Sequence, residues 1–145
     1  MIRRVTTDEE SLEVDAIAND PIVKQTSMLG YKHYTHDLYF EDVVADAKNH
    51  VLIEDGFCAI FAWTSPGVYE CHIMAMKQSR GASMFDAGKR MLAYMKEQGA
   101  RQVWGQPSIY NRGAICYIRR MGLKLYGSGT HPMLGDVQYF VTEVL

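Results

Sequence analysis

The first third of the chain begins with alternating apolar and polar residues and then changes to helical spacing. Residues 2–6 alternate well enough for a strand, and Thr7 is predicted to cap a helix whose first turn is acidic. We expect this helix to end near Pro21, because the Asn-Asp-Pro sequence there is a stop signal. Residues 21–38 are expected to be irregular, and a second short helix is predicted over about 39–49.

The middle of the chain contains two apolar runs, 51–53 and 58–63, that are separated by an Asp-Gly pair. Asp-Gly between such runs is a strong signal for a β-hairpin. A Pro-Gly turn at 66–67 then leads into a further strand over 68–76. Three consecutive strands joined by short turns predict an antiparallel meander.

The C-terminal half alternates helices with strands. Helices are predicted over 84–98 and 112–121, each followed by a glycine that favours a helix end. Three strands are expected, one from Val103 and the last two over 123–126 and 137–144. The resulting order, β-α-α-β-β-β-α-β-α-β-β, predicts an α/β fold with a mixed, mostly antiparallel sheet and helices on both faces.

Length and composition narrow the class of protein. The 145 residues suit a single domain, 1–145, of the ordinary globular type. The sequence contains no run of 18 apolar residues, so no membrane span is expected. The first residues lack the apolar core of a signal peptide. Cys58, Cys71 and Cys116 are an odd number without short paired spacing. This pattern argues against disulfides and a cysteine zinc site, and it favours a cytoplasmic location.

Charge is divided unevenly along the chain. Residues 1–72 contain 13 acidic and 5 basic residues, whereas residues 73–145 contain 4 acidic and 10 basic residues. Such asymmetry is one sign of an anionic ligand on one side, although acidic solvated helices early in the chain explain it equally well. The basic residues form no dense stripe and belong to no nucleic-acid-binding motif, so nucleic acid is not an expected partner.

The junction after the fourth predicted strand, residues 74–83, is the first candidate binding site. A strand leads through a turn of small residues into a helix, whose first N–H groups are unpaired and carry partial positive charge. Gly81 allows close approach to the backbone, and Lys77 and Arg80 add positive charge. These features suit a pyrophosphate, while an ordinary turn capped by Ser83 is the alternative.

Two short motifs extend this interpretation. Gln78-x-x-Gly81-x-Ser83 resembles the acetyl-CoA-binding motif, Gln/Arg-x-x-Gly-x-Gly/Ala, of the GCN5-related N-acetyltransferases. Asn111-x-x-Ala114, at the start of the next predicted helix, is similar to a later motif of that family. The resemblance covers these motifs and the element order of nearly the whole chain. It implies the fold of that family and acetyl-CoA as co-substrate.

The resemblance also implies which residues hold the cofactor. Residues of the turn would line its pyrophosphate, namely Gln78, Ser79, Arg80, Gly81, Ala82 and Ser83. Met74 and Met76 would offer backbone groups to the pantetheine arm, in a gap where the strand from Val103 diverges from the fourth strand. Asn111 would lie near the pantetheine or the thioester.

The acid that protonates the departing thiolate is less clear. The family often has a Tyr four residues before the glycine that ends the second motif helix, and here that position is Ile118. Tyr117 is adjacent, but one residue corresponds to about 100° around a helix. Tyr117, Tyr110 and solvent all remain candidates.

Candidate bases lie on the fourth strand. Glu70 and His72 are two residues apart and therefore share a face. A carboxylate or His can remove the proton of an attacking amine, and burial is expected to raise the pKa of Glu70 and suit it to that role. An exposed Glu in an ion pair and a structural His are the alternatives. Cys71 is expected to pack on the opposite face and Cys116 to lie in the core.

Two segments are expected to form the walls of an acceptor pocket. One is 31–40, which is rich in Tyr and His and equally suits a partner-binding surface, and the other is a loop over 127–136. His33, His36 and Asp37 supply few ligands, so no metal site is expected.

The resemblance therefore predicts an acetyl-CoA-dependent N-acetyltransferase that acts on an amine of a small molecule or protein by direct attack. The chain also looks like small acetyltransferase-like proteins of tailed phages, some of which are grouped with head-assembly or internal virion proteins. These keep the fold while catalytic residues vary, so a non-catalytic role in the virion or host is the alternative. An exposed C-terminal strand could also pair across a homodimer.

Overall fold

A single β-sheet organises the computed structural model, which describes residues 1–27 and 36–145. Its strands in spatial order are β1 (Arg3–Val5), β2 (His50–Glu54), β3 (Phe57–Ser65), β4 (Val68–Ala75), β5 (Gln102–Gly105), β7 (Gly135–Val141) and β6 (Lys124–His131). Neighbouring strands are antiparallel except β4 and β5, which are parallel. The predicted meander and the mixed, mostly antiparallel sheet are confirmed.

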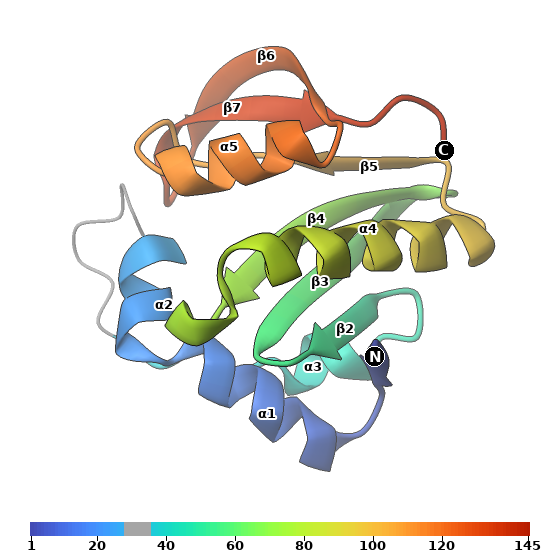
Figure 1. Ribbon diagram of the computed structural model, residues 1–145, viewed down its shortest axis with the longest axis vertical. Helices are drawn as coiled ribbons and strands as arrows, with labels where there is room; N and C mark the ends of the chain where they lie inside the picture. The colour runs from blue at the N-terminus through green and yellow to red at the C-terminus, as the bar shows by residue number, and fades with distance from the viewer. Residues whose placement is uncertain (28–35) are drawn as a thin grey trace.

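Helices cover both faces of this sheet (Figure 1). One face carries α1 (Asp8–Ala18), α2 (Pro21–Ser27) and α3 (Glu41–Ala45), and the other carries α4 (Ala82–Glu97) and α5 (Arg112–Arg120). The alternation of side chains along the strands divides the core into two apolar clusters, one on each face. None of the helices in the described part of the chain is both long enough and apolar enough to cross a membrane.

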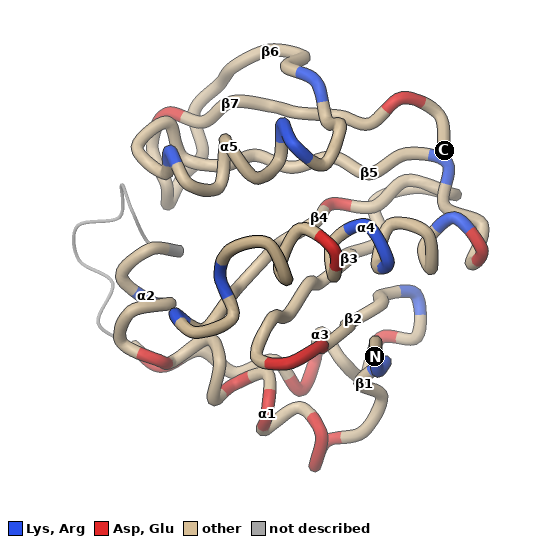
Figure 2. Tube along the Cα trace, in the orientation of Figure 1, with Lys and Arg blue, Asp and Glu red and all other residues tan. Residues whose placement is uncertain are grey.

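The acidic and basic residues concentrate on different elements of the fold (Figure 2). Acidic residues occupy the first turns of α1 and α3, whereas α5 has basic residues in its last turn. Lys77 and Arg80 flank the turn that leads into α4. The positive charge predicted from the second half of the sequence therefore lies mostly around α4 and α5.

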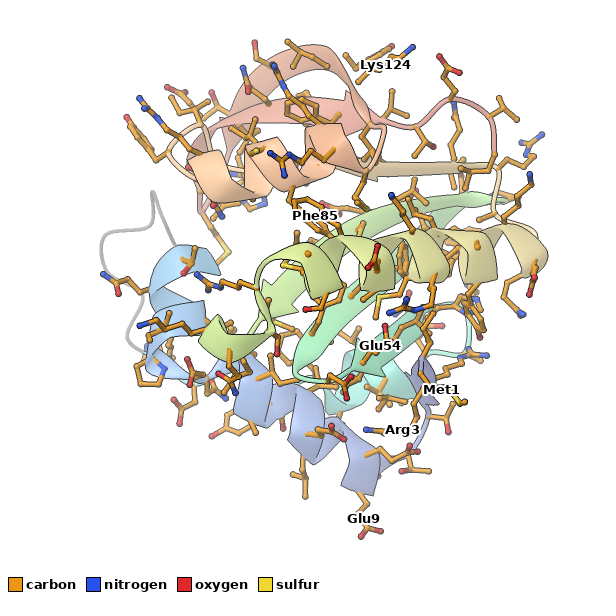
Figure 3. All side chains as sticks on the ribbon, viewed as in Figure 1. Met1, Arg3, Glu9, Glu54, Phe85 and Lys124 are labelled. Carbon is orange, nitrogen blue, oxygen red and sulfur yellow. The ribbon has the colours of Figure 1, made fainter. Side chains whose placement is uncertain are left out.

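An ion pair joins α4 to the sheet at the end of β2. The carboxylate of Glu54, which is labelled in Figure 3, is buried and accepts a 2.7 Å hydrogen bond from Arg90 Nη2. The hydrogen bond and charge of Arg90 hold the pKa of Glu54 below its usual range, against the opposing effect of burial. Because an unpaired buried carboxylate would be unfavourable, this contact helps to set the position of α4.

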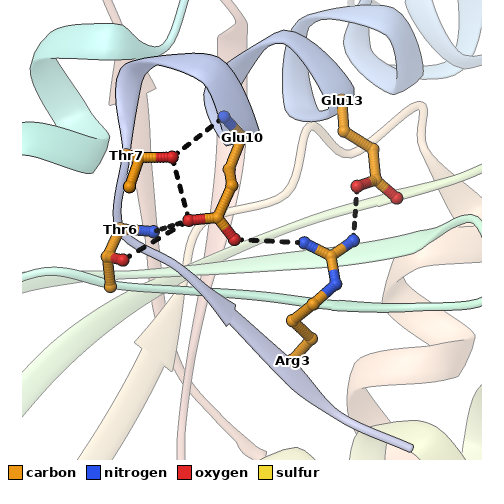
Figure 4. A network of polar contacts seen from close by, with 5 residues as sticks. All are labelled: Arg3, Thr6, Thr7, Glu10 and Glu13. Carbon is orange, nitrogen blue, oxygen red and sulfur yellow. Dashed lines mark hydrogen bonds and ion pairs between the residues drawn. The ribbon is translucent and has the colours of Figure 1, made fainter.

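The predicted cap of α1 is confirmed (Figure 4). Thr7 Oγ1 accepts a hydrogen bond from the N–H of Glu10, and Glu10 Oε1 accepts one from the Thr7 hydroxyl at 2.9 Å. Thr7 and Glu10 are therefore bonded in both directions, and the Glu10 carboxylate also accepts a 3.4 Å hydrogen bond from the Thr6 N–H. Arg3 of β1 binds both Glu10 and Glu13, so the same cluster joins the first strand to the first helix.

Two expectations for residues 21–49 are wrong. Residues 21–27 form α2 rather than irregular chain, because Asp20 accepts hydrogen bonds from the first N–H groups of that helix and Pro21 occupies its first position. The helix expected over 39–49 is only the five-residue α3. It ends at Asp46, whose carboxylate accepts from the Lys48 N–H in a turn.

The loop expected over 127–136 is mostly strand. β6 continues to His131 and β7 begins at Gly135, so the two strands form a long hairpin. The glycines of β6 resemble a loop in composition, yet Gly129 allows close approach of Tyr139, whose hydroxyl oxygen lies 2.6 Å from the position of an added Cβ. One expected wall of the acceptor pocket is therefore a hairpin.

The first residue of β2, His50, is 7% exposed and gives the fold a dependence on pH. Its ring makes edge contacts with Tyr69 and Tyr94 at 5.7 and 5.9 Å, and its Nδ1 has no hydrogen-bond partner among the described residues. Burial, and then the charge of Arg4, lower the pKa of His50. The folded protein therefore favours neutral His50, whereas the unfolded chain takes up a proton near the usual pKa.

We expect His50→Phe to make the free energy of unfolding less sensitive to pH. The Phe ring keeps the contacts with Tyr69 and Tyr94 and cannot titrate. Wild-type stability should fall relative to the variant as pH decreases below about 6.5, where unfolded His50 binds its proton. Urea unfolding between pH 8 and 5 measures this difference, and parallel stability curves for the two proteins would contradict it.

Candidate active site

A cavity of about 340 Å³ opens where α2, β4, α4 and α5 meet. Its walls come from the end of β4, the turn before α4 and the first turn of α5, with Val23 and Thr26 of α2 closing one side. Several predicted site residues belong to these walls, namely Met74, Arg80, Gly81, Asn111 and Tyr117. The sequence motifs separated along the chain therefore meet around one space.

The sheet opens beside this cavity. The parallel pairing of β4 with β5 begins at Val68↔Gln102 and ends at Glu70↔Trp104, although β4 continues to Ala75. The two strands therefore diverge beyond Glu70, as expected for the fourth and fifth strands (Figure 1). Beyond this point, no strand of the described residues pairs with β4 on the β5 side.

Main-chain groups of alternate β4 residues face the resulting gap. The carbonyl oxygen of Cys71 lies 3.7 Å from the position of an added Cβ at Gly105, and the carbonyl of Ala75 accepts a 3.2 Å hydrogen bond from Arg80 Nε. Because the direction of N–H and C=O groups repeats every two residues, Ile73 presents its N–H and C=O to the same gap.

The backbone groups expected from Met74 and Met76 are therefore shifted by one residue. Met76 donates its N–H to the carbonyl of Gly56 at 3.0 Å, on the β3 side of the strand. Beyond Glu70, the β4 residues whose main chain faces the gap are Cys71, Ile73 and Ala75. Motif spacing points to β4, whereas the direction in which each of its backbone groups faces depends on the register with β3.

The N-terminus of α4 is open toward the cavity. Gly81 is its N-cap, with φ of 110°, and makes no side-chain hydrogen bond to the helix. An added Cβ at Gly81 would have no atom within 4 Å, so space lies over the first turn. The alternative of Ser83 as cap is wrong, because the helix begins at Ala82. Unpaired N–H groups and the helix dipole make this end suitable for an anion.

The other residues of the turn differ in exposure and in their contacts. Gln78, Ala82 and Ser83 are exposed and do not belong to the cavity wall. The hydroxyl of Ser79 is different, because it is buried and donates a 2.5 Å hydrogen bond to the carbonyl of Asp55. Ser79 therefore joins this turn to the β2–β3 hairpin, and its side chain does not line the cavity.

Thr26, a residue that sequence reasoning missed, is held from both sides of the cavity. Arg80 Nη2 donates to Thr26 Oγ1 at 3.2 Å, and Asn111 Nδ2 donates to the Thr26 carbonyl at 3.3 Å. Asn111 also caps α5 by accepting from the Ala114 N–H. Thr26 lies in the stretch expected to be irregular, and its position beside Arg80 and Asn111 depends on the formation of α2.

Tyr117 is buried against α4. Its hydroxyl donates a 2.9 Å hydrogen bond to the carbonyl of Met84, and its ring stacks on Phe85 with centroids 5.2 Å apart. Burial raises the pKa of Tyr117, so the hydroxyl keeps its proton at neutral pH. Ile118 faces a second, smaller cavity between the helices and the sheet.

Glu70 lies where β4 and β5 separate, about 10 Å along the strand from Ile73. Gln106 Nε2 donates to its carboxylate at 2.7 Å, and His72 Nε2 lies 3.5 Å from the other oxygen. Burial pushes the pKa of Glu70 upward, but these two partners and the charge of His131 hold it below its usual value. The expected rise in the pKa of Glu70 is therefore wrong, because His72, Gln106 and His131 together outweigh the effect of burial. Sequence patterns did not indicate Gln106 and His131, which are remote from Glu70 along the chain.

The remaining candidates differ from one another. Cys71 is partly buried, and burial raises its pKa to about 12, as expected for a packed thiol. Cys116 is exposed in the cavity wall, and its expected place in the core is wrong because only one side of α5 packs on the sheet.

His33 lies outside the described residues, as does the rest of 28–35. Within the described ranges, no three His, Cys, Asp or Glu residues are placed to hold a metal ion.

The fit between Tyr117 and Gly88 gives a test of this packing. A Cβ at Gly88 would lie 2.0 Å from the Tyr117 hydroxyl oxygen and 2.7 Å from Met121 Sδ. We expect Gly88→Ala to lower the free energy of unfolding by about 1–3 kcal/mol through overpacking. Tyr117→Phe should recover part of that loss in the double variant, because it removes the closest atom. Urea unfolding measures all three variants.

Gly113→Ala is the matched control, because its added Cβ would meet only Asn111 Oδ1, at 4.0 Å, in an exposed helical turn. This substitution should be neutral or stabilise by about 0.4–1 kcal/mol. Additive effects of Gly88→Ala and Tyr117→Phe would show that the two residues do not compete for the same space.

Comparison with known proteins supports the fold. No protein family model matches the sequence, and no curated protein matches it. Among solved structures, an N-acetyltransferase from Staphylococcus aureus Mu50 superposes with a TM-score of 0.77 at 12% identity, over 99% of this chain and 96% of that one. The ribosomal-protein-alanine N-acetyltransferase of Brucella melitensis gives 0.74 at 13% identity, over 100% and 99%.

A third similar structure was solved with ligands. The aminoglycoside acetyltransferase AAC(6')-Ib, in complex with coenzyme A and kanamycin, gives a TM-score of 0.72 at 15% identity, over 99% of this chain and 94% of that one. At these identities the likeness concerns the backbone. The chain therefore has the α/β fold found in N-acetyltransferases, with its cavity beside the gap between β4 and β5.

Proposed function

We propose that residues 1–145 form one acyltransferase domain, which binds acetyl-CoA and transfers the acetyl group to an amine of a small molecule or protein. The observation that carries this proposal is the cavity of about 340 Å³, whose wall includes both the uncapped start of α4 and the unpaired part of β4. The similar structure with bound coenzyme A supports it.

The shape and charge of the cavity fit the two parts of coenzyme A. Its pyrophosphate would meet the first N–H groups of α4, the open backbone at Gly81 and the guanidinium of Arg80. Gln78, Ala82 and Ser83 are exposed in the same segment of the chain. The pantetheine arm, which carries amide groups, would lie along the free main chain of Ile73 and Ala75, with Asn111 on the opposite wall.

The reaction is direct attack on the thioester that acetyl-CoA supplies. The amine nitrogen forms a bond to the carbonyl carbon, the C–S bond breaks, and the thiolate takes up a proton as it leaves. The N–H of Ile73 faces the gap and would polarise the carbonyl oxygen. The proton lost by the amine goes to Glu70, directly or through water.

The lowered pKa of Glu70 makes it an anion at neutral pH. An anion at this place attracts a cationic amine and then accepts its proton. His72, 3.5 Å from Glu70 and with an exposed side chain, is positioned to pass that proton to solvent. The acidic surface of the first half of the chain also suits a cationic acceptor.

Tyr117 is the protein's candidate for protonating the thiolate, since it lines the cavity and retains its proton. Its hydroxyl must first leave the carbonyl of Met84. This engaged hydroxyl, together with Ile118 at the usual Tyr position, supports a second candidate function. In that alternative the chain is a non-catalytic partner-binding protein, as in the phage proteins it resembles, and exposed Leu125 and Tyr126 on the edge strand β6 offer a surface for a second copy.

Acetyl-CoA should raise the melting temperature of the protein, because a ligand that binds only the folded state stabilises it by about 2.7 kcal/mol at one hundred times its Kd. Arg80→Ala should weaken that binding about tenfold through loss of a phosphate contact. Arg119→Ala is the control, since Arg119 lies over the Phe140 ring and outside the cavity wall. No shift with saturating cofactor would contradict the proposed function.

Glu70→Gln should reduce acetyl transfer by at least one hundredfold while the acetyl-CoA-induced shift in melting temperature stays unchanged. The amide keeps the size of the side chain and removes its charge. Glu97→Gln, at the far end of α4, is the matched control. Turnover would be followed with a panel of polyamine, aminoglycoside and peptide amines. Unchanged turnover in Glu70→Gln would show that Glu70 is not the proton acceptor. If acetyl-CoA binds and no amine is acetylated, the result favours the non-catalytic function.

A further inference from the structure

The smaller cavity, of about 50 Å³, lies directly beside the main one. It is enclosed by the sheet on one side and by α4 and α5 on the other, where β4 and β5 separate. Ile73 and Tyr117 belong to the walls of both cavities. The two cavities therefore adjoin at these two side chains, and a group in the main cavity would have to pass between them to enter the smaller one.

The smaller cavity is apolar. Side chains from both strands and both helices line it, among them Cys71, Val103, Leu92, Ile118 and Leu123. The Tyr117 hydroxyl at its edge already donates to Met84, and the Cys71 thiol stays protonated because burial raises its pKa to about 12. A buried water needs two to four polar partners, and the lining side chains offer only the weakly polar Cys71 thiol. The space suits hydrocarbon.

Gly105 and Ile118 set the depth of this space. Ile118 Cδ1 lies 3.8 Å from the position of an added Cβ at Gly105, so the two residues face each other across the cavity. Ile118 occupies the position where the resembled family often has Tyr. An apolar side chain therefore stands where a hydroxyl would otherwise be, which makes the space more suitable for an alkyl chain.

We propose that this cavity holds the acyl chain of the donor, and that the protein prefers propionyl- and butyryl-CoA to acetyl-CoA. This inference rests on the proposed function and specifies its donor. An apolar cavity of about 150 Å³ holds benzene, which has six carbons, so a cavity of about 50 Å³ has room for about two additional carbons. The transfer step is otherwise unchanged, with the longer acyl group passing from sulfur to the amine nitrogen.

A series of ligands tests this preference by calorimetry or thermal shift. Free coenzyme A and its acetyl, propionyl, butyryl and hexanoyl thioesters would be compared with the wild-type chain. We expect affinity to rise about fourfold for each added methylene up to butyryl, as for the burial of a CH₂ group, and to fall again for hexanoyl. Relative turnover with a fixed amine should follow the same order.

Variants at Gly105 and Ile118 show whether this cavity is responsible. Gly105→Ala meets only ordinary contacts and should return the preference to acetyl-CoA, since its methyl group occupies the space. Gly127→Ala is the matched control, because its added Cβ has no atom within 4 Å on β6. Ile118→Ala enlarges the cavity and should shift the optimum toward hexanoyl-CoA.

The outcomes separate this inference from the proposed function. If neither coenzyme A nor any thioester binds, the proposed function fails. If coenzyme A binds and chain length has no effect, only the acyl-chain inference is overturned. The same conclusion follows if Gly105→Ala and Gly127→Ala give the same chain-length profile. A preference for butyryl-CoA that is lost in Gly105→Ala and retained in Gly127→Ala supports the inference.

Discussion

The short parallel pairing between β4 and β5 is the constraint on which the site depends. β4 is bound along its length to β3, yet it pairs with β5 only as far as Glu70. Buried backbone N–H and C=O groups need partners, so the unpaired stretch of β4 must be satisfied by other elements or by a ligand. Arg80 meets this need at Ala75. The main chain of Ile73 remains facing the gap, and the cavity lies in front of it.

The helices around that gap are positioned by contacts at its edges. Thr26 receives hydrogen bonds from Arg80 before α4 and from Asn111 before α5, so three helices meet at one residue. Tyr117 joins α5 to the first turn of α4 through Met84. The residues that border the cavity are therefore also residues that hold the helices in place. The same side chains serve the architecture and the site.

Local signals predicted much of this arrangement. The N-cap at Thr7, the Asp-Gly hairpin and the strand-turn-helix junction at Gly81 each depend on neighbours in sequence, and the structure agrees with them. The Asp20-Pro21 pair both ends α1 and begins α2, and from sequence alone it indicates only the end of the first helix. By contrast, the phase of the β4 backbone depends on strand register, and the pKa of Glu70 depends on partners such as Gln106. Those features arise only when remote segments pack together.

The packing of Tyr117 against Gly88 has a consequence for the evolution of such chains. The two positions belong to different helices and share one volume, so neither can enlarge unless the other becomes smaller. A side chain at position 88 is therefore expected to be tolerated best together with a smaller residue at position 117. We expect Gly88 and Tyr117 to change together in chains that share this packing. That pair is a criterion for finding relatives where overall identity is as low as 12–15%.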